Sequence, residues 1–519
     1  MKRTYINLRL WSRIRIRMMP NWSSAVQLIK RMVMPNWSSA VQLITAILIF
    51  PCWLVAQVAP GAGEELTPKG FTTPWAFVNT DSNRIRFAEN LDPFMARLHN
   101  LGSDSVRQIR IVHIGDSHLL ADVFSGKLRT LFQQKFGSAG RGLIFPYRLA
   151  GTNGPRDYTC SSNVYWQSLK SIYAGEGSSL GLSGLGIRSG TGAPALYLQM
   201  KQKEAPQCAF DKVTIFCKDA SGDWNIGLPE GGVLAPKSVQ YETGAKHYHK
   251  VRSGDTLYDL ARKYGCTVRN LQNWNGIRGS RINPGKKLIV GVTRKAIPAP
   301  AVEKTPLRPL ESVRQEGGAH HVVFQLDSLL TSAAIEHQGS TLLHGILLEN
   351  TREPGVLYNM IGVNGATYNH YNQAAYFLPQ LAALSPDLVI ISLGTNESVG
   401  GRFDGGAIRR DVERLVRNIQ KELPGAAILL TTNPDILKRR SYLNVNNLAV
   451  RSILLEVAAA NGLAVWDMHS VMGGHGSVKK WRSSGLAAKD AIHFTNEGYQ
   501  LLGTLLFEAL MQTYHAAGD

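Results

Sequence analysis

The sequence predicts an α/β protein with a parallel sheet, interrupted by a β-rich module that is itself interrupted by a small βααβ unit. Three observations support this prediction. Apolar strands alternate with helical stretches in the first and last parts of the chain, which is the pattern of a parallel sheet covered on both faces. Between about Cys160 and Leu347 the pattern changes to short strands rich in glycine and serine. A unit with two short helices lies within that stretch.

The α/β part is predicted from hydrophobic periodicity. The segment Gln108–Ile114 is β-branched and apolar, as a buried strand requires, and a helical pattern follows from about Leu119 to Phe136. The same alternation returns near the end of the chain. There it predicts strands at Asp387–Ser392, Ala427–Thr431 and Ala464–Trp466, and helices at Asp411–Glu422, near Asn447–Asn461 and from Asn496 to about Thr513.

The insertion is predicted to contain strands at Ala195–Met200, Lys212–Cys217, His321–Leu326 and Leu342–Leu348. Its βααβ unit spans His247–Gly291, and the Pro- and charge-rich stretch Thr293–Gly318 indicates a linker. The chain therefore divides into an N-terminal segment (1–57), an α/β part in two pieces (58–160 and 348–519), a β-rich insertion in two pieces (161–246 and 319–347), the βααβ unit (247–291) and the linker (292–318).

The N-terminus indicates export. Residues 1–57 hold eight Lys or Arg and no Asp or Glu, and they include an apolar run from about Ala40 to Val55. A basic start, a short apolar run and a small residue near its end are typical of a secretory signal, here with cleavage after Ala56. A retained membrane anchor is the alternative, although the run is slightly short for a span and contains Pro51. We expect the protein in the periplasm or cell envelope.

Composition and charge limit the function classes. The chain has 519 residues, 44% of them hydrophobic and 18% charged, which fits two or three globular domains rather than a disordered chain. Without the eight N-terminal cations the formal net charge falls from +19 to +11, which suits an anionic envelope surface or acidic glycans. Nucleic acid is not an expected partner, because the chain looks exported and shows no nucleic-acid motif.

The cysteines and histidines do not predict a metal site. No CxxC motif or Cys/His metal spacing is present in the sequence, so zinc is not expected. His469 and His475 show no metal-ligand pattern, and we interpret them as structural. Cys208 and Cys217 either form a disulfide in an oxidising compartment or remain buried thiols.

Several short motifs stand at predicted turns. Ser117 follows the first strand and opens a helix, which exposes its hydroxyl at the carboxyl end of the sheet, where a helix N-terminus favours developing negative charge. Gly362 and Gly365 lie in the stretch Ile361–Ala366, which follows a predicted strand or turn, and glycine there lets a backbone N–H approach a ligand. Asn396 follows the strand Asp387–Ser392, where a side-chain amide can donate to an oxyanion.

Asp490 and His493 precede the last helix. This spacing can place the carboxylate against the imidazole Nδ1, which leaves Nε2 free to take a serine proton. Each motif alone has an ordinary interpretation as a turn, a cap or a packed histidine. Their occurrence in this order, with two of them directly after clear strands, favours one catalytic site.

The order Gly-Asp-Ser, Gly, Gly-x-Asn and Asp-x-x-His resembles that of the SGNH hydrolases. The resemblance implies a three-layer, flavodoxin-like parallel sheet with Ser117 as nucleophile, His493 as base and Asp490 as the carboxylate that orients it. Gly365 (backbone) and Asn396 (side chain) would complete the oxyanion hole with the Ser117 N–H. Gly365 is preferred to Gly362 because the family's glycine usually holds the second place of such a turn.

Residues 115–146 and 472–503 are similar to a subgroup that contains bacterial peptidoglycan O-acetylesterases, in which a β-sandwich module interrupts the hydrolase domain. The resemblance implies an exported serine esterase that removes O-acetyl groups from cell-wall glycan, first of all peptidoglycan, without a metal or organic cofactor. The alternatives are a glycan O-acetyltransferase or lipase on the same site, or a catalytically silent peptidoglycan-binding protein. For His118, beside the nucleophile, substrate contact and packing remain equally open.

The βααβ unit resembles a LysM domain over its whole length. The resemblance implies binding of N-acetylglucosamine-containing glycans in a groove between two loops, with candidate contacts at Gly254, Asp255, Thr256, Leu257, Asn275, Gly276 and Ile277. Within residues 247–291, nine Lys or Arg stand against two Asp, which favours adhesion to an anionic wall over a solvated surface without a ligand.

Overall fold

The computed structural model describes residues 73–518, apart from 173–178, 191–192, 202–207, 230–240, 265, 267, 278, 297–306, 311, 316 and 400–402. The predicted signal or anchor at 1–57 and part of the predicted linker lie outside the described residues. Among the helices that the structure describes, none has the length and apolar character needed to cross a membrane.

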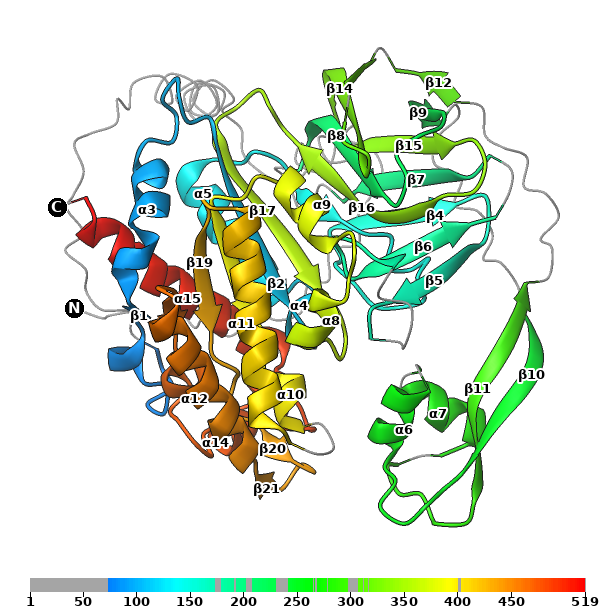
Figure 1. Ribbon diagram of the computed structural model, residues 1–519, viewed down its shortest axis with the longest axis vertical. Helices are drawn as coiled ribbons and strands as arrows, with labels where there is room; N and C mark the ends of the chain where they lie inside the picture. Colours follow the sequence, from blue (N-terminus) through cyan, green and yellow to red (C-terminus); the bar gives the residue numbers. More distant parts are fainter. Residues whose placement is uncertain are drawn as a thin grey trace, which may run out of the picture. The chain divides into compact units, whose positions relative to one another are not determined.

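Six strands form the central sheet in the order β1-β22-β19-β18-β2-β17 (Figure 1). All of its pairings are parallel except that of β1 with β22. The strands are β1 (Ile85–Arg86), β2 (Gln108–Gly115), β17 (Gly355–Gly362), β18 (Leu388–Ser392), β19 (Ala427–Thr431) and β22 (Ala464–Trp466). The predicted α/β class with a parallel sheet is confirmed.

The register of this sheet brings three strand ends to one level. Gly115 at the end of β2 pairs with Gly362 at the end of β17 and with Ser392 at the end of β18. Residues that follow these strands therefore meet at the carboxyl edge of the sheet, where open α/β sheets usually bind ligands.

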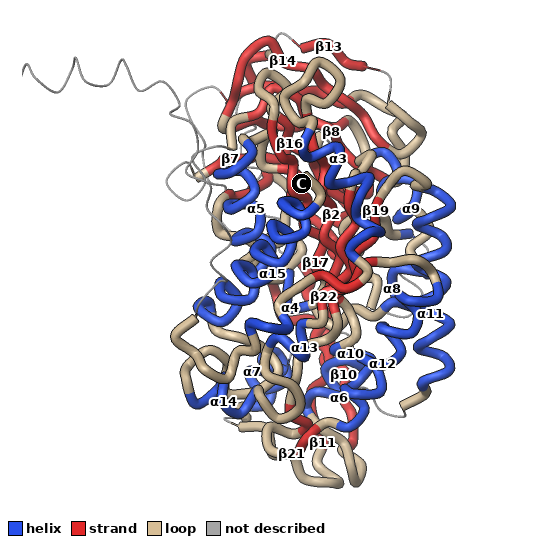
Figure 2. Tube along the Cα trace, turned by 90° about the vertical axis from the view of Figure 1, so that its left-hand side faces the viewer, coloured by secondary structure: helices blue, strands red, loops and turns tan. Residues whose placement is uncertain are grey.

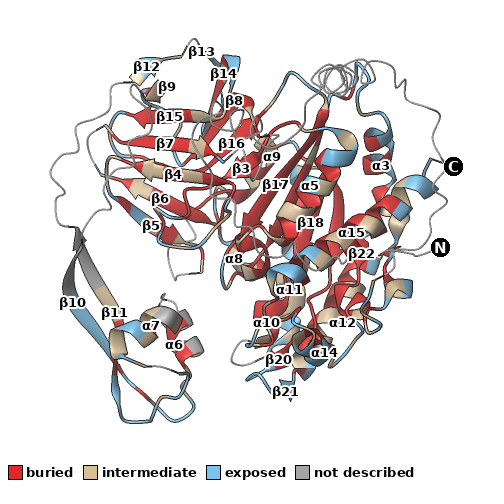
Figure 3. Cartoon of the chain, turned by 180° about the vertical axis from the view of Figure 1, so that it is seen from behind, coloured by how far each residue is buried: buried red, intermediate tan, exposed pale blue. Residues whose placement is uncertain are grey.

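Helices cover both faces of the sheet. Figure 2 shows α5 and α15 on one side of the strands and α11 and α12 on the other, and Figure 3 shows the strands between them buried. The helical elements are η1 (Thr80–Ser82), η2 (Ala88–Leu91), α3 (Asp92–His99), α4 (Ser117–Leu120), α5 (Phe124–Phe136), α8 (Tyr368–Asn372), α9 (Phe377–Ala383), α10 (Thr395–Val399), α11 (Gly405–Glu422), α12 (Val445–Ala460), α13 (Met468–Val471), α14 (Val478–Ser483) and α15 (Asn496–Ala516).

The single helix predicted for Leu119–Phe136 is broken into α4 and α5. Asp122 interrupts it with a φ of 54°. Its carboxylate forms ion pairs with Arg141 at 2.7 Å and with Arg129 at 2.8 Å. The buried Arg141 also pairs with Asp157, at 2.6 Å. Buried charges are tolerated only when paired, so this cluster ties the start of α5 to Arg141 and Asp157, which follow it in the chain.

The β-rich insertion forms two antiparallel sheets, in the orders β12-β9-β15-β7-β4 and β13-β14-β8-β16-β6-β5, with β3 paired to β16. The predicted strands appear as β7, β8, β14 and β16. The bounds are β3 (Gly142–Ile144), β4 (Tyr158–Ser162), β5 (Trp166–Lys170), β6 (Leu185–Ser189), β7 (Ala195–Met200), β8 (Phe210–Cys217), β9 (Trp224–Pro229), β12 (Leu307–Pro309), β13 (Ser312–Gln315), β14 (His321–Leu330), β15 (Ser332–His337) and β16 (Leu342–Glu349).

Two details of the insertion differ from or complete the sequence analysis. The range 292–318, predicted as a linker, contains β12 and β13, because their backbone groups pair with β9 and β14. Cys208 and Cys217 are both buried free thiols, so they do not form a disulfide in the structure.

The βααβ unit consists of β10 (Tyr241–Lys250), α6 (Leu257–Lys263), α7 (Val268–Asn275) and β11 (Lys287–Ala296). It has a separate small core that includes Leu260, Leu271 and Leu288. Its two strands pair from Lys250 with Lys287 to Tyr241 with Ala296. The hairpin therefore extends beyond the predicted limits of the unit at both ends.

Candidate active site

Ser117 is the first residue of α4, directly after β2. A Cβ on Gly115 would lie 2.6 Å from Leu119 Cδ1 and 2.9 Å from the Ser392 carbonyl oxygen, so glycine is required where the strand turns into the helix. The Asp116 side chain caps this helix by accepting from the His118 N–H at 2.9 Å. The chain therefore presents the Ser117 hydroxyl at the carboxyl edge of the sheet.

Ser117, His493 and Asp490 form a continuous chain of contacts. Ser117 Oγ lies 2.9 Å from His493 Nε2, and His493 Nδ1 lies 2.8 Å from Asp490 Oδ2. Both distances are those of hydrogen bonds, and the two bonds orient the imidazole between a hydroxyl and a carboxylate. The structure thus brings together three side chains that the sequence separates by up to 376 positions.

The backbone holds the segment Asp490–His493 in this geometry. Asp490 Oδ1 accepts hydrogen bonds from the N–H groups of Ile492 and His493, each at 3.0 Å. The fully buried Ala491, between Asp490 and Ile492, has a φ of 55°, which a non-glycine residue adopts only under strain. The Ala491 carbonyl accepts from the Leu437 N–H at 2.9 Å, which ties the segment to the chain after β19.

Asp490 and His493 each stabilise the charged form of the other. Burial by itself would lower the pKa of His493, but the hydrogen bond and the negative charge of Asp490 outweigh it, and the pKa is raised. Burial by itself would raise the pKa of Asp490, but the contact with His493 holds that pKa well below its usual range. Asp490 is therefore ionised near neutral pH, and His493 is a stronger proton acceptor than a free imidazole.

Asn396 and Gly365 are the two remaining predicted site residues, and their surroundings differ. The buried Asn396 amide donates to Asp116 Oδ2 at 3.1 Å and to the Ala366 carbonyl at 2.9 Å. Gly365 has a φ of +81°, and the nearest atom to a Cβ position there is Ile172 Cδ1, at 3.9 Å, so the turn after β17 is not crowded at this residue. By contrast, a Cβ on Gly362 would meet the Leu120 backbone, which marks Gly362 as a packing glycine.

If the Asn396 amide stabilises an oxyanion, replacing it with alanine is expected to lower kcat by about 10²–10³-fold and to change KM little. Asn446→Ala, also beside α10, serves as the control, because Asn446 contributes one long hydrogen bond to Ser398. Initial rates per folded enzyme, with melting curves for both variants, make the measurement. A lower melting midpoint with an unchanged kcat would instead assign Asn396 a purely structural role.

The sequence analysis missed two buried carboxyl groups behind the site. Burial raises the pKa of Asp116 to about 6 and that of Glu397 to about 7. Glu397 accepts from the Tyr368 N–H at 2.9 Å, while its second oxygen is buried without a hydrogen-bond partner. Each of the two is the neighbour in sequence of a predicted site residue, and this adjacency could have identified them as candidates. Their burial could not be predicted from the sequence.

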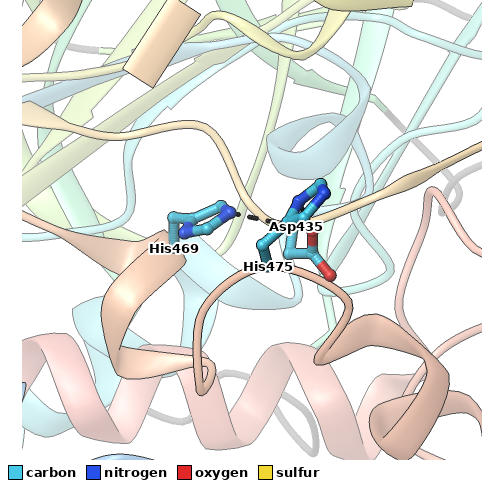
Figure 4. A group of neighbouring side chains, drawn as sticks. All are labelled: Asp435, His469 and His475. Atoms are coloured by element: carbon cyan, nitrogen blue, oxygen red, sulfur yellow. Dashed lines mark ion pairs between the residues drawn. The ribbon is translucent and has the colours of Figure 1, made fainter. Parts of the chain in front are cut away.

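Three histidines left as structural or open have distinct surroundings. His118 is buried and its Nδ1 lies 3.0 Å from the Tyr499 hydroxyl, which favours the packing interpretation. His469 and His475 were interpreted as structural from their spacing, but the structure places both beside Asp435 (Figure 4). Asp435 is distant from both in sequence, so no local pattern could have revealed the group.

Most predicted glycan contacts in the βααβ unit have side chains engaged within the unit. Leu257 is buried in its core. Asp255 binds the His249 ring at 2.8 Å, Thr256 Oγ1 donates to Asp259, and the Asn275 amide binds both the N–H and the carbonyl of Ile289. Ile277 packs against the core, while Gly254 and Gly276 lack side chains and have open space around them.

Comparison with known families gives two matches. A profile of the GDSL-like Lipase/Acylhydrolase family matches residues 332–501, and a profile of the LysM domain matches residues 249–291. The first match includes Asn396, Asp490 and His493. Ser117 lies outside it, on the other side of the β-rich insertion.

The chain is also similar to known proteins in parts. It is 31% identical over 154 residues to an autolysin of Enterococcus faecalis (30% of this chain, 18% of that protein). It is 44% identical over 48 residues to membrane-bound lytic murein transglycosylase D of Escherichia coli (9% of this chain, 11% of that protein). The chain thus spans less than a fifth of these two relatives. A solved structure of a peptidoglycan O-acetylesterase has the same fold, with a TM-score of 0.57, 22% identity and coverage of 82% of this chain and 96% of that chain.

Proposed function

Because this chain carries a GDSL-like lipase/acylhydrolase domain and a LysM domain, we propose that it is a cell-wall esterase that removes O-acetyl groups from peptidoglycan. The observation that carries the proposal is the chain of contacts from Ser117 Oγ to His493 and on to Asp490, at 2.9 and 2.8 Å. The similar proteins support the same proposal, since an autolysin, a murein transglycosylase and a peptidoglycan O-acetylesterase are among them.

The proposed reaction is acyl transfer in two steps. Ser117 Oγ attacks the acetyl carbonyl while His493 Nε2 takes its proton, and the tetrahedral oxyanion accepts hydrogen bonds from the Ser117 and Gly365 N–H groups. An N–H of the Asn396 amide joins them by leaving one of its two present acceptors, Asp116 Oδ2 or the Ala366 carbonyl. His493 then protonates the departing sugar hydroxyl, which leaves an acetyl-Ser117 ester. Water, deprotonated by His493, hydrolyses that ester and releases acetate. Asp490 holds the imidazole in the required tautomer throughout.

The substrate class rests on the LysM domain and its charge. The described basic residues of this domain that have a burial class are all exposed, and they are Lys250, Arg252, Lys263, Arg281, Lys286 and Lys287. A dense set of exposed cations attracts an anionic polymer over several ångströms at low salt. We propose that the domain holds the enzyme on the wall, where acetylated glycan is concentrated around the active site.

Reversing two of these charges, with Lys286→Glu and Lys287→Glu together, is expected to weaken retention on insoluble peptidoglycan at low salt and to have little effect at high salt. A sedimentation assay across salt concentrations measures this. The matched control reverses two exposed charges on α11, Arg414→Glu and Lys421→Glu, which gives the same net charge. Equal losses for both pairs would mean that net charge, and not the LysM surface, governs retention.

The decisive test is acetate release by the full chain from O-acetylated peptidoglycan, set beside the same material after chemical de-esterification. We expect release from the first substrate alone. Acetyl transfer to an added glycan acceptor faster than to water would replace the esterase proposal with a transferase. Release from a lipid ester but not from peptidoglycan would replace it with a lipase. Retention on peptidoglycan without cleavage of either ester would indicate a binding protein.

We further propose that the enzyme acts outside the cytoplasm, in the periplasm or envelope, delivered by the predicted signal or anchor within residues 1–57. Fractionation of cells that produce the full chain, followed by N-terminal sequencing, tests this. An uncleaved protein in the membrane fraction would favour the anchor, and a mature protein that begins at Gln57 would favour the cleaved signal.

A further inference from the structure

Asp435, His469 and His475 form a cluster that takes no part in the proposed reaction (Figure 4). Among the residues that the structure describes, it is the group of at least three His, Cys, Asp or Glu whose ligand atoms all lie within 4.8 Å of one another. Asp435 lies in the loop after β19, and His469 lies in α13 just after β22. Because β19 and β22 are parallel neighbours, the cluster lies at the carboxyl edge of the sheet.

Two atoms of this cluster are buried without hydrogen bonds. Asp435 Oδ1 and His469 Nε2 have no hydrogen-bond partner, and the two residues are 0% and 3% exposed. Asp435 Oδ2, by contrast, accepts from the Val478 N–H at 2.9 Å. Buried polar atoms nearly always have a hydrogen-bond partner, so a carboxylate oxygen and an imidazole nitrogen that face each other without a hydrogen bond need an explanation.

The distances within the cluster fit a shared cation. Asp435 Oδ1 lies 3.7 Å from His469 Nε2 and 3.6 Å from His475 Nδ1, which is longer than a hydrogen bond in both cases. Two ligands of a tetrahedral zinc ion, each about 2.1 Å from the metal, lie about 3.4 Å apart. The carboxylate oxygen is therefore spaced from each imidazole nitrogen as two ligands of one ion are, and all three atoms lie within 4.8 Å of one another.

The chemistry of these ligands selects the metal. Two imidazoles and one carboxylate are ligands typical of zinc and other first-row transition metals, whereas magnesium and calcium prefer oxygen alone. The His475 side chain is 28% exposed, which leaves a path for the ion to enter and for water to take a fourth position.

We propose that Asp435 Oδ1, His469 Nε2 and His475 Nδ1 bind one zinc-type divalent cation. The ion would join three segments, namely the loop after β19, helix α13 and the turn before α14. Leu437, two residues after Asp435, donates its N–H to the Ala491 carbonyl within the segment that carries Asp490 and His493. The loop that carries Asp435 is thus linked to the catalytic segment by a backbone hydrogen bond.

The test is zinc binding by the full chain, produced without a histidine tag and stripped with a chelator. Equilibrium dialysis with Zn²⁺ and metal analysis is expected to give one tightly bound ion and a higher melting midpoint, since a ligand that binds only the folded state stabilises it. Mg²⁺ at the same concentration is expected to give neither. His475→Gln, a change at the one exposed residue of the three, should lower zinc affinity by more than the roughly 10–100-fold that second-shell changes cost.

His247→Gln is the matched control, because it removes an exposed histidine of β10 outside the cluster and should leave the tight ion in place. Asp435→Asn provides a second variant, and if it fails to fold, the His475→Gln result still decides. Equal zinc affinity and an equal zinc-induced melting shift in the wild type and His475→Gln would overturn the proposal, as would a wild type that binds no zinc. Because the readouts are metal content and melting, they are independent of whether the chain is an esterase.

Discussion

Ser117→Ala is expected to abolish measurable acetate release, with kcat lowered by about 10⁶-fold. A methyl group cannot attack the ester carbonyl, and no other described hydroxyl forms a hydrogen bond with His493 Nε2. Residual rate above that in water would come from the oxyanion donors and from substrate binding. The fold should tolerate the change, since it removes one half-buried hydroxyl and one hydrogen bond, worth about 1 kcal/mol.

Initial rates on O-acetylated peptidoglycan and on a small chromogenic acetate measure this effect. Ser484→Ala is the control, because Ser484 follows α14 near the catalytic segment and its side chain is half-buried like that of Ser117. We expect Ser484→Ala to keep the wild-type rate. Acetate release by Ser117→Ala at a rate close to that of the control would remove Ser117 as nucleophile, and the esterase proposal for this site would fail with it.

Asp490→Asn is expected to change both the rate and its pH dependence. Catalysis needs neutral His493, so activity falls as the pH drops below the pKa of that imidazole. In the wild type the Asp490 contact raises this pKa, and the acidic limb of kcat/KM therefore lies above the ordinary value of 6.5. Without the carboxylate the pKa of His493 falls, so the limb moves to lower pH, while the plateau drops by about 10⁴-fold because the wrong tautomer is favoured.

Profiles of kcat/KM against pH for the wild type and Asp490→Asn measure both effects. Asp104→Asn, a change at an exposed aspartate, should leave the limb and the plateau unchanged. NMR titration of the His493 ring gives its pKa independently of activity. A limb that stays in place or moves to higher pH in Asp490→Asn would show that Asp490 does not set the pKa of His493.

Much of the α/β fold could be predicted because its strands are buried on both faces. The segments Asp387–Ser392 and Ala427–Thr431 consist almost wholly of apolar residues, and the structure places strands at Leu388–Ser392 and Ala427–Thr431. The break at Asp122 could not be predicted from the local sequence, because the Asp122 carboxylate pairs with Arg141, a residue beyond the end of α5. The strands β12 and β13 were missed because backbone pairing with β9 and β14 outweighs the Pro- and charge-rich composition of their range.

The two resemblances drawn from the sequence, to an SGNH-type hydrolase and to a LysM domain, are confirmed by the family profiles. The roles of the individual residues remain predictions. For the catalytic group the local sequence was informative, because each residue follows a recognisable strand or precedes a recognisable helix. For the LysM loops the local sequence was less informative, because the side chain of Leu257 packs in the core of the unit and that of Asn275 hydrogen-bonds to its backbone.

The sequence by itself determined which residues follow the strands of the sheet, because periodicity and turn residues are local properties of the chain. Only the tertiary structure decided which of them meet. The register that aligns Gly115, Gly362 and Ser392 brings the segments that carry Ser117, Gly365 and Asn396 to one edge of the sheet, and the pairing of β19 with β22 brings Asp435 to His469. Both outcomes depend on pairing between strands that are distant in sequence, and no local pattern of residues encodes such pairing.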